Sequence, residues 1–424
     1  MNRKNCYSKF LVFIYLMLFL FIQGGYTQVG YVVGPPGINL KTTNSGENWF
    51  IQNGFPSTPY LFGVFFSNSN TGYAVGSHTP NFRGIILKTT NGGANWTEKL
   101  IPYFNMFYDV HFINSSTGYA VGYHTLSYEG LILKTTNGGN NWISQSHNLL
   151  YILTSVYFLD EYTGIVSGTS DVQGVIYRTT DGGNNWIKQF NTALNGLNSI
   201  CLVDQNIGYS VGVAGQVYKT TNGGVNWFSQ VSNTTRNLEC VEFVNADTGI
   251  AVGGTIIRTS NGGTNWTSVS VQPTYSMYGV SFVSPTLCIA VGLGGEVLRS
   301  TDSGLTWDSI ASNVNYNLFS VSFPSTIVNI NKLSEVISNY KLHQNYPNPF
   351  NPATSIKFDI QKTSPTKLIV YDALGREVAT LVNEVLKAGS YQVDWNGSNY
   401  TSGVYFYTLQ AGDYIETKKM LLLK

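Results

Sequence analysis

A nine-residue motif that ends in tryptophan recurs along most of the chain and constrains the fold more than any other feature. It reads KTTNSGENW in its first copy, KTTNGGANW in its second and RSTDSGLTW in its last. The seven copies end at Trp49, Trp96, Trp142, Trp186, Trp227, Trp266 and Trp307. Successive copies are 39 to 47 residues apart, which is the length of one four-stranded blade of a β-propeller.

Two further sequence patterns, which we call columns, recur at the same place in each repeat and divide it into strands. A segment similar to TGYAVG, as at Thr71 and Thr117, precedes each tryptophan motif, and a Val-x-Phe pair such as Val64 and Phe66 precedes that segment. Together with an apolar run and the stretch after the tryptophan, these columns predict four strands per repeat. The glycine pair inside the motif predicts a tight turn between the third and fourth strands.

The two ends of the repeat array complement each other. The array begins at a second-strand segment, from Val29, and ends at a lone Val-x-Phe pair, Val321 and Phe323. If this last first strand joins blade one, the ring closes without a free edge. We therefore predict an all-β protein with a seven-bladed β-propeller over residues 28–326.

Composition and charge agree with this fold and exclude some partners. The chain holds 44 glycines and 14% aromatic residues, and only 11% of its residues are charged. A net charge of +1 gives no reason to expect nucleic acid as a partner. Cys201, Cys240 and Cys288 lie in apolar runs, which indicates buried packing and neither a disulfide framework nor a metal site. We expect no metal and no cofactor.

The first residues indicate a signal for export. Arg3, Lys4 and Lys9 accompany an apolar run over residues 10–22, which small residues follow. A membrane anchor is the alternative, but this run is short for crossing a bilayer. We predict a signal peptide over residues 1–27 and no transmembrane segment in the mature chain.

The last part of the chain predicts a separate module. After a linker over residues 327–342, residues 343–424 contain NYPNPFNPATSIKFDI from Asn345 and SGVYFYTLQAG from Ser402. Alternating apolar residues and glycine turns predict a small Ig-like β-sandwich. These motifs resemble the type A C-terminal sorting domain of the type IX secretion system of Bacteroidota. The resemblance implies that residues 343–424 address the chain to the secretion machinery, by way of the periplasm, with the propeller as cargo.

The tryptophan motif itself resembles the Asp-box, or BNR repeat, in which an Asp or Asn ties a turn and the tryptophan packs between blades. The resemblance implies a structural role for Asp181, Asp302 and the seven tryptophans. Some Asp-box propellers are sialidases, which need three arginines on the substrate carboxylate. Here seven of the 11 basic residues of positions 28–323 open a copy of the motif, and Arg83 and Arg236 are the only arginines of this range outside the motif. We conclude that the chain is not a sialidase.

A glycoside hydrolase with two carboxylates is the alternative class. No pair motif singles out two acids, and Asp-box xyloglucan-cleaving enzymes use two tandem propellers where this chain has one. The acids of the propeller include Asp109, Glu129, Asp160, Glu161, Asp171 and Glu242. We therefore expect no enzyme activity.

Taken together, the repeat columns are similar to the photosystem II assembly factor propellers of cyanobacteria and chloroplasts. That resemblance implies a non-catalytic, chaperone-like binding domain that uses a basic patch. This propeller departs from the pattern, because positions 28–323 hold 11 basic and 15 acidic residues.

The loops between second and third strands are unequal, and we call the long ones of blades two to four the crown. They lie on the face opposite the tryptophan motifs, and His78 and His124 occupy equivalent positions in them. An aromatic crown with a few charges suits sugar or peptide, although ordinary loops in an aromatic-rich chain would look similar. The predicted binding residues are His78, Phe82, Arg83, His124, Tyr128, Glu129 and Asp171.

We therefore expect a monomeric binding or scaffold propeller, secreted or held at the outer-membrane surface. Its partners would be the type IX machinery and an extracellular protein or glycan. A purely structural role in the cell envelope is a third hypothesis.

Overall fold

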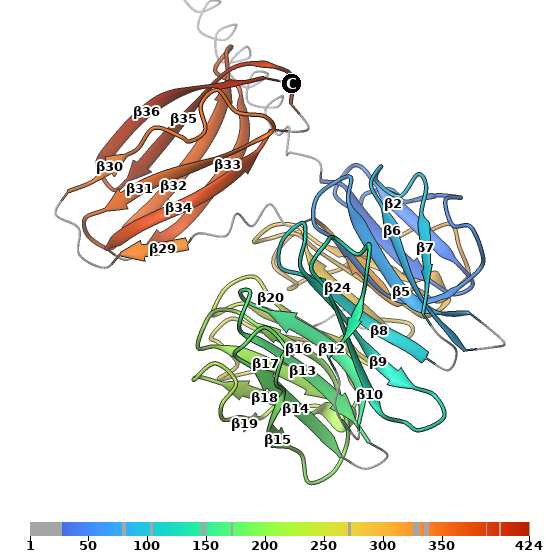
Figure 1. Ribbon diagram of the computed structural model, residues 1–424. Coiled ribbons are helices and arrows are strands. Elements are labelled where there is room, and N and C mark those ends of the chain that lie inside the picture. Colours follow the sequence, from blue (N-terminus) through green and yellow to red (C-terminus); the bar gives the residue numbers. More distant parts are fainter. Residues whose placement is uncertain are drawn as a thin grey trace, which may run out of the picture. The chain divides into compact units, whose positions relative to one another are not determined.

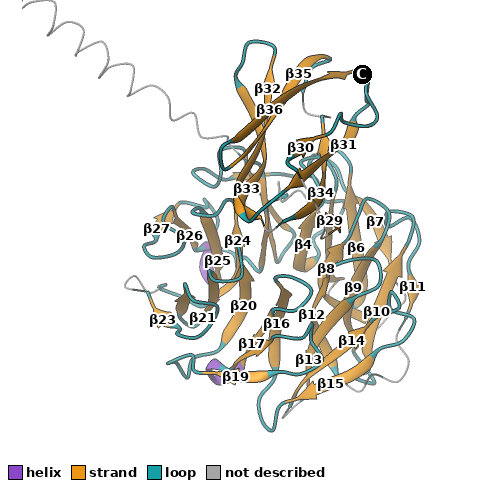
Figure 2. Cartoon of the chain, turned by 90° about the vertical axis from the view of Figure 1, so that its left-hand side faces the viewer, coloured by secondary structure: helices purple, strands orange, loops and turns teal. Residues whose placement is uncertain are grey.

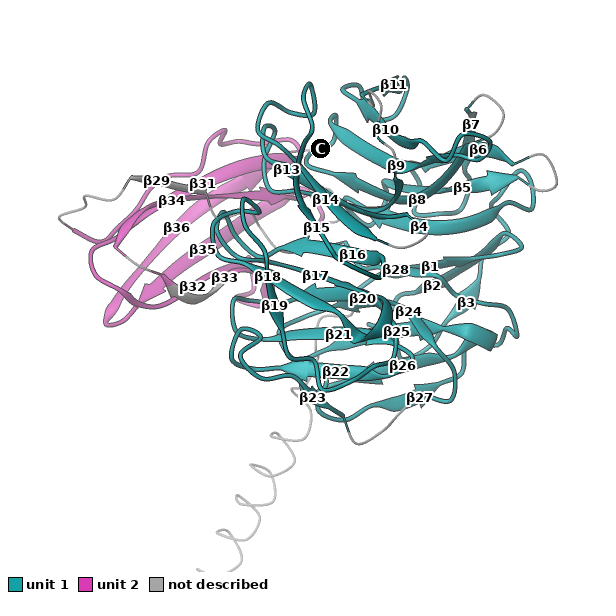
Figure 3. Ribbon diagram, turned by 90° about the horizontal axis from the view of Figure 1, so that it is seen from below, with its two compact units in different colours: residues 1–324 teal, residues 325–424 magenta. Residues whose placement is uncertain are grey.

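The computed structural model describes residues 28–78, 82–101, 105–145, 149, 151–170, 173–269, 273–324, 331–334, 339–386, 388–397 and 400–423. The predicted signal peptide lies outside these residues. The chain divides into two compact units between Pro324 and Ser325 (Figure 3). In the described part of the chain, no helix has the length and apolarity needed to cross a membrane.

Seven antiparallel sheets of four strands form the first unit (Figure 1). The innermost strands of blades one to seven are β28 (Ser320–Ser322), β4 (Tyr60–Phe66), β8 (Asn105–Phe112), β12 (Ile152–Phe158), β16 (Leu197–Leu202), β20 (Leu238–Phe243) and β24 (Met277–Phe282). The second strands are β1 (Gly30–Gly34), β5 (Gly72–His78), β9 (Gly118–His124), β13 (Gly164–Thr169), β17 (Gly208–Gly212), β21 (Gly249–Gly253) and β25 (Cys288–Gly292).

The third strands are β2 (Ile38–Thr42), β6 (Arg83–Thr89), β10 (Gly130–Thr135), β14 (Gly174–Thr179), β18 (Val217–Thr220), β22 (Ile256–Thr259) and β26 (Val297–Ser300). The outermost strands are β3 (Phe50–Ile51), β7 (Thr97–Leu100), β11 (Ile143–Ser144), β15 (Ile187–Asn191), β19 (Phe228–Gln230), β23 (Thr267–Ser268) and β27 (Asp308–Ile310). Figure 2 shows two single-turn helices, η1 (Val213–Gly215) and η2 (Leu293–Gly295), which make the short connections after the second strands of blades five and seven.

The ring closes as predicted. Strand β28, from the end of the array, pairs antiparallel with β1, from its start, and Val321 lies opposite Val32. The innermost strands contact one another in order around the ring, including β28 with β4. The predicted seven-bladed propeller, closed by its last first strand, is therefore confirmed.

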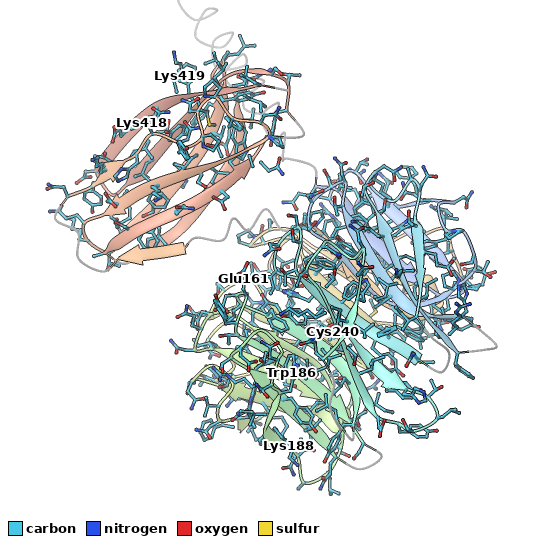
Figure 4. All side chains as sticks on the ribbon, viewed as in Figure 1. Glu161, Trp186, Lys188, Cys240, Lys418 and Lys419 are labelled. Carbon is cyan, nitrogen blue, oxygen red and sulfur yellow. The ribbon has the colours of Figure 1, made fainter. Side chains whose placement is uncertain are left out.

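Each motif tryptophan packs against the preceding blade. Trp266 of blade six is fully buried and lies edge-on to Tyr209 of blade five, at a centroid distance of 6.4 Å. Trp49 packs with Ile289 and Val291 of blade seven, across the closure. Trp186, in blade four, is labelled in Figure 4.

The three cysteines of the propeller form no disulfide, and Cys201 and Cys288 are buried. Cys240, on β20, is labelled in Figure 4.

Polar contacts cross the same boundaries. Tyr119 Oη and Lys134 Nζ of blade three both donate to the carbonyl oxygen of Gly182 in blade four, at 2.8 and 2.7 Å. Equivalent pairs occur at other boundaries, such as Tyr209 and Lys219 on Gly262. The basic residue that opens the motif thus joins neighbouring blades, and this occupies it structurally.

The acid of the Asp-box ties the turn that comes after it. Asp302 Oδ1 accepts the amides of Leu305 and Thr306 at 3.0 and 2.9 Å, and Asp302 Oδ2 accepts the Thr306 hydroxyl at 2.6 Å. Desolvation opposes ionisation of this carboxyl, but these hydrogen bonds prevail and lower its pKa. Asp181 makes the equivalent bond to the amide of Asn185 at 2.9 Å.

The second unit is a β-sandwich of two four-stranded sheets, β29-β34-β31-β30 and β33-β32-β35-β36. Its strands are β29 (Asn331–Ser334), β30 (Lys341–Leu342), β31 (Ala353–Ile360), β32 (Ser364–Asp372), β33 (Glu377–Leu386), β34 (Gly389–Asn396), β35 (Gly403–Ala411) and β36 (Tyr414–Leu422). One apolar core, which includes Phe358, Trp395 and Tyr407, joins both sheets. Strands β29 and β30 fall in the range predicted as linker and pair with β34 and β31.

Candidate binding face of the propeller

The crown hairpins of blades two and three share one design. In each, a histidine ends the second strand, an aromatic residue follows four positions later and a charged residue comes next: His78, Phe82 and Arg83 in one, and His124, Tyr128 and Glu129 in the other. Phe82 and Tyr128 both have positive φ, +47° and +57°, and are 45% and 61% exposed. Because this conformation is unfavourable for a bulky side chain, both hairpins hold an aromatic ring in solvent at a cost of roughly 1–3 kcal/mol each.

The two predicted histidines have separate partners. His78 Nε2 lies 2.9 Å from Glu98 Oε1, on the outermost strand of its own blade. His124 Nδ1 lies 3.2 Å from Ser127 Oγ, which also lies 3.2 Å from Glu129 Oε2. Within the described residues, no three His, Cys, Asp or Glu side chains are grouped as metal ligands would be.

A backbone contact brings the two hairpins together. The amide of Asn105, at the start of β8, donates to the carbonyl of Phe82 at 3.0 Å, and Asn105 pairs with His124 in the β8–β9 register. Arg83 lies opposite His78 in the register of its own hairpin. The predicted residue Asp171, from blade four, lies outside the described residues.

A second set of residues, which the sequence reasoning missed, meets around the propeller axis. In each of the innermost strands of blades two to seven, the pairing register skips one residue at the same position, as in a β-bulge. The skipped residue is half-buried and follows a fully buried apolar residue. With Phe319 directly before β28, these residues form what we call the axial ring: Phe62, Tyr108, Thr154, Asn198, Glu239, Tyr278 and Phe319.

One side of the axial ring is aromatic. Tyr278 contacts Phe319 at a centroid distance of 4.9 Å, and Phe319 contacts Phe62 at 5.4 Å. Phe62 in turn contacts Tyr108 at 5.3 Å. The side chains of four consecutive blades therefore form a continuous arc.

The arc continues outward to the crown. Tyr108 stacks on Tyr123 of β9 at 5.9 Å, and Tyr123 stacks on Tyr128 at 5.9 Å. Aromatic contacts thus lead from the inner strands to the exposed, strained Tyr128. A signal in the sequence could have revealed the ring, because each member lies two positions before the Val or Ile of the Val-x-Phe column.

The other side of the ring is polar. Thr154 Oγ1 donates to the carbonyl of Leu197 at 2.9 Å, and Asn198 Nδ2 donates to Glu239 Oε2 at 2.9 Å. Burial raises the pKa of the Glu239 carboxyl. Glu239 and Tyr278 are the bulged residues of the neighbouring strands β20 and β24, which contact each other. Burial, and to a smaller degree the charge of Glu239, raises the pKa of Tyr278.

Several acids weighed for hydrolysis hold the backbone in place. Asp109 Oδ2 accepts the Val156 amide and the Ser155 hydroxyl, both at 2.9 Å, and Glu242 Oε2 accepts the Phe282 amide at 3.0 Å. These amides lie on innermost strands, whose inner edges have no further strand to pair with. Burial raises the pKa of Glu242 to about 8.

Two further acids lie in turns. Asp160 Oδ1 accepts the amides of Tyr162 and Thr163 at 2.8 and 2.6 Å. Glu161 Oε1 accepts the side-chain amide of Asn114 at 3.2 Å.

Part of each unit matches a known protein family. Residues 95–262 match the family described as Photosynthesis system II assembly factor YCF48, and residues 344–423 match the Secretion system C-terminal sorting domain. The predicted resemblances are therefore confirmed, and the sorting tail implies export by the type IX secretion system. No curated protein sequence matches the chain.

Solved structures support the fold of the propeller. The structure of YCF48 bound to D1 peptide is 18% identical, with a TM-score of 0.50, over 80% of this chain and 93% of that chain. A protein from Lactobacillus plantarum is 9% identical, with a TM-score of 0.54, over 70% of this chain and 99% of that chain. A GH74 enzyme from Niastella koreensis is 12% identical over 93% of this chain and 73% of that chain, and its TM-score of 0.32 is too low to bear on activity.

Proposed function

We propose that the propeller is the exported cargo and binds an extracellular protein segment through its crown, without catalysis. The tail would address the chain through the periplasm to the cell surface or the medium. The observation that carries this proposal is the pair of strained, exposed aromatic rings, Phe82 and Tyr128, at equivalent positions of adjacent blades. Backbone strain that recurs at equivalent exposed positions is typical of a functional site, where it holds side chains in place.

A protein ligand is favoured over a glycan by analogy of fold. The similar structure of YCF48 has a D1 peptide bound, so a propeller of this kind can hold a peptide. Exposed aromatic rings serve either ligand, because they supply a large rigid contact area at low entropic cost. A glycan is therefore the alternative ligand.

The absence of catalysis is part of the proposal. It is supported by the roles of Asp109 and Glu242, whose carboxylates accept edge amides and are engaged in holding neighbouring blades. A hydrolase would need an acid and a carboxylate free to face a substrate. Release of reducing ends from a polysaccharide by the purified chain would overturn this part.

The binding proposal can be tested with the chain from residue 28 onward. We would compare wild type with a Phe82→Ala/Tyr128→Ala variant in pull-downs from cell-surface protein extracts and on a glycan array. A matched control is Ile187→Ala/Phe228→Ala, which removes two aromatic or aliphatic side chains that are 61% and 58% exposed on outermost strands.

Loss of a ligand in the crown variant alone would support the proposal. Equal binding by all three proteins would contradict it, because the crown would then contribute nothing.

A further inference from the structure

The axial ring carries one ionisable acid and no basic residue. Glu239 is the acid, and the other members are four aromatic residues, a threonine and an asparagine. Arg236 lies three positions before Glu239 in the chain, and it donates from Nη1 to the carbonyl of Gly254 at 2.9 Å. Among the described side chains, no ion pair joins Glu239 to a basic group.

Glu239 differs from the other acids of the inner strands. Asp109 and Glu242 each accept a backbone amide from the next blade. Glu239 accepts the side-chain amide of Asn198 instead, through Oε2. A half-buried carboxylate that holds no backbone group is costly to keep unless a positive charge comes to it.

The aromatic arc begins on the blade next to this carboxylate. Glu239 and Tyr278 occupy equivalent bulge positions on the contacting strands β20 and β24. From Tyr278 the arc runs through Phe319 and Phe62 to Tyr108. Aromatic faces attract cations through their quadrupole, and most strongly where water is partly excluded. Both halves of the site therefore favour a positive charge.

We propose that the axial ring is a cation site, which takes the ammonium group of a lysine side chain between Glu239 and the arc of Tyr278, Phe319, Phe62 and Tyr108. This proposal rests on the proposed function, because the lysine belongs to the protein segment that the crown holds. It names the chemistry of that segment: a lysine that reaches the axis while the flanking chain contacts Tyr128. The opposite charge of ligand is disfavoured, since a carboxylate would meet Glu239.

Short peptides can test the charge preference without the natural partner. The probes are acetylated and amidated Gly-Gly-Lys-Gly-Gly, the same peptide with norleucine, which keeps the carbon chain without charge, and the same peptide with glutamate. Their affinities for the chain from residue 28 onward would be measured by NMR titration. We expect the lysine peptide to bind about tenfold more tightly than the norleucine peptide.

Two variants assign the site. Glu239→Gln and Phe319→Leu should each reduce this preference for lysine about three- to tenfold. The control is Glu47→Gln, because Glu47 is 60% exposed on the opposite face, near Arg299. Near-UV circular dichroism and the melting temperature would show that each variant is folded.

Equal affinity for the lysine and norleucine peptides, or a preference unchanged in both Glu239→Gln and Phe319→Leu, would overturn the cation site. If the crown variant still lost its surface ligand in that case, the proposed function would stand and this inference alone would fail. If the lysine peptide is preferred but the Phe82→Ala/Tyr128→Ala variant still binds its surface ligand normally, the cation site would stand and the proposed function of the crown would fail.

Discussion

The hydrogen bonds that join neighbouring blades can be tested at the boundary of blades five and six. There the carbonyl oxygen of Gly262 accepts Tyr209 Oη at 2.8 Å and Lys219 Nζ at 2.6 Å. Gly262 is buried, so water does not readily replace a donor that is removed. Tyr209→Phe removes only a hydroxyl, because the ring keeps its stack on Phe243 at 3.7 Å.

Each single variant should cost little. Tyr209→Phe and Lys219→Met each leave the carbonyl with one donor, so each should lower the free energy of unfolding by about 1 kcal/mol. The double variant leaves a buried acceptor unpaired, which adds roughly 1–3 kcal/mol. We therefore expect the double variant to lose about 3–5 kcal/mol, clearly more than the sum of the singles.

The assay is urea unfolding followed by tryptophan fluorescence. Seven of the eight tryptophans end the propeller motifs, so the signal reports mainly on this unit. Tyr218→Phe is the matched control, because Tyr218 lies on the adjacent strand β18 and is half-buried. A double variant that equals the sum of the singles within about 0.5 kcal/mol would refute the shared acceptor.

Three more predictions follow from single sites. Trp266→Ala should lower the free energy of unfolding by about 3–5 kcal/mol in the same assay, because Trp266 is fully buried between two blades. Phe82→Gly and Tyr128→Gly should each raise the melting temperature slightly while they weaken ligand binding, since glycine relieves the positive φ; a lower melting temperature would contradict the strain. Burial raises the pKa of Glu242 from 4.5 to about 8, so the stability this group gives is complete below about pH 4.5 and is lost as the pH rises through 8. The change in the free energy of unfolding caused by Glu242→Gln should therefore be more favourable at pH 9 than at pH 5. Equal changes at both pH values would contradict the raised pKa.

The sequence revealed the propeller because each blade solves the same local problem. The turn after each third strand needs an Asp or Asn acceptor, as at Asp302, and each boundary needs a large aromatic, as at Trp266. Repetition makes these demands visible in one sequence. The strand β29 was not visible, because it joins the sandwich by backbone pairing with Tyr391 and Gln392 and needs no special residues for that.

The candidate site was only partly predictable. The crown followed from loop length, but the strain at Phe82 and Tyr128 did not, since steric rules argue against aromatic residues at positive φ. The axial ring depends on a bulge in the innermost strands of blades two to seven. Its members hold a fixed place, two positions before the Val or Ile of the Val-x-Phe column, but the residue types there vary from blade to blade, so no shared residue marks them.

Variation among the seven blades gives an argument that does not depend on any other protein. Blades with the same geometry place the same physical demands on equivalent positions, so a column fixed by folding should be uniform, as the tryptophan column is. The axial ring varies between aromatic and polar residues, while the position before it is fully buried and apolar in every blade. The variation is also ordered, since Tyr278, Phe319, Phe62 and Tyr108 are consecutive around the ring and Thr154, Asn198 and Glu239 fill the rest. Folding does not require this division into an aromatic and a polar half, and the division supports the proposal that a ligand meets the ring from one side.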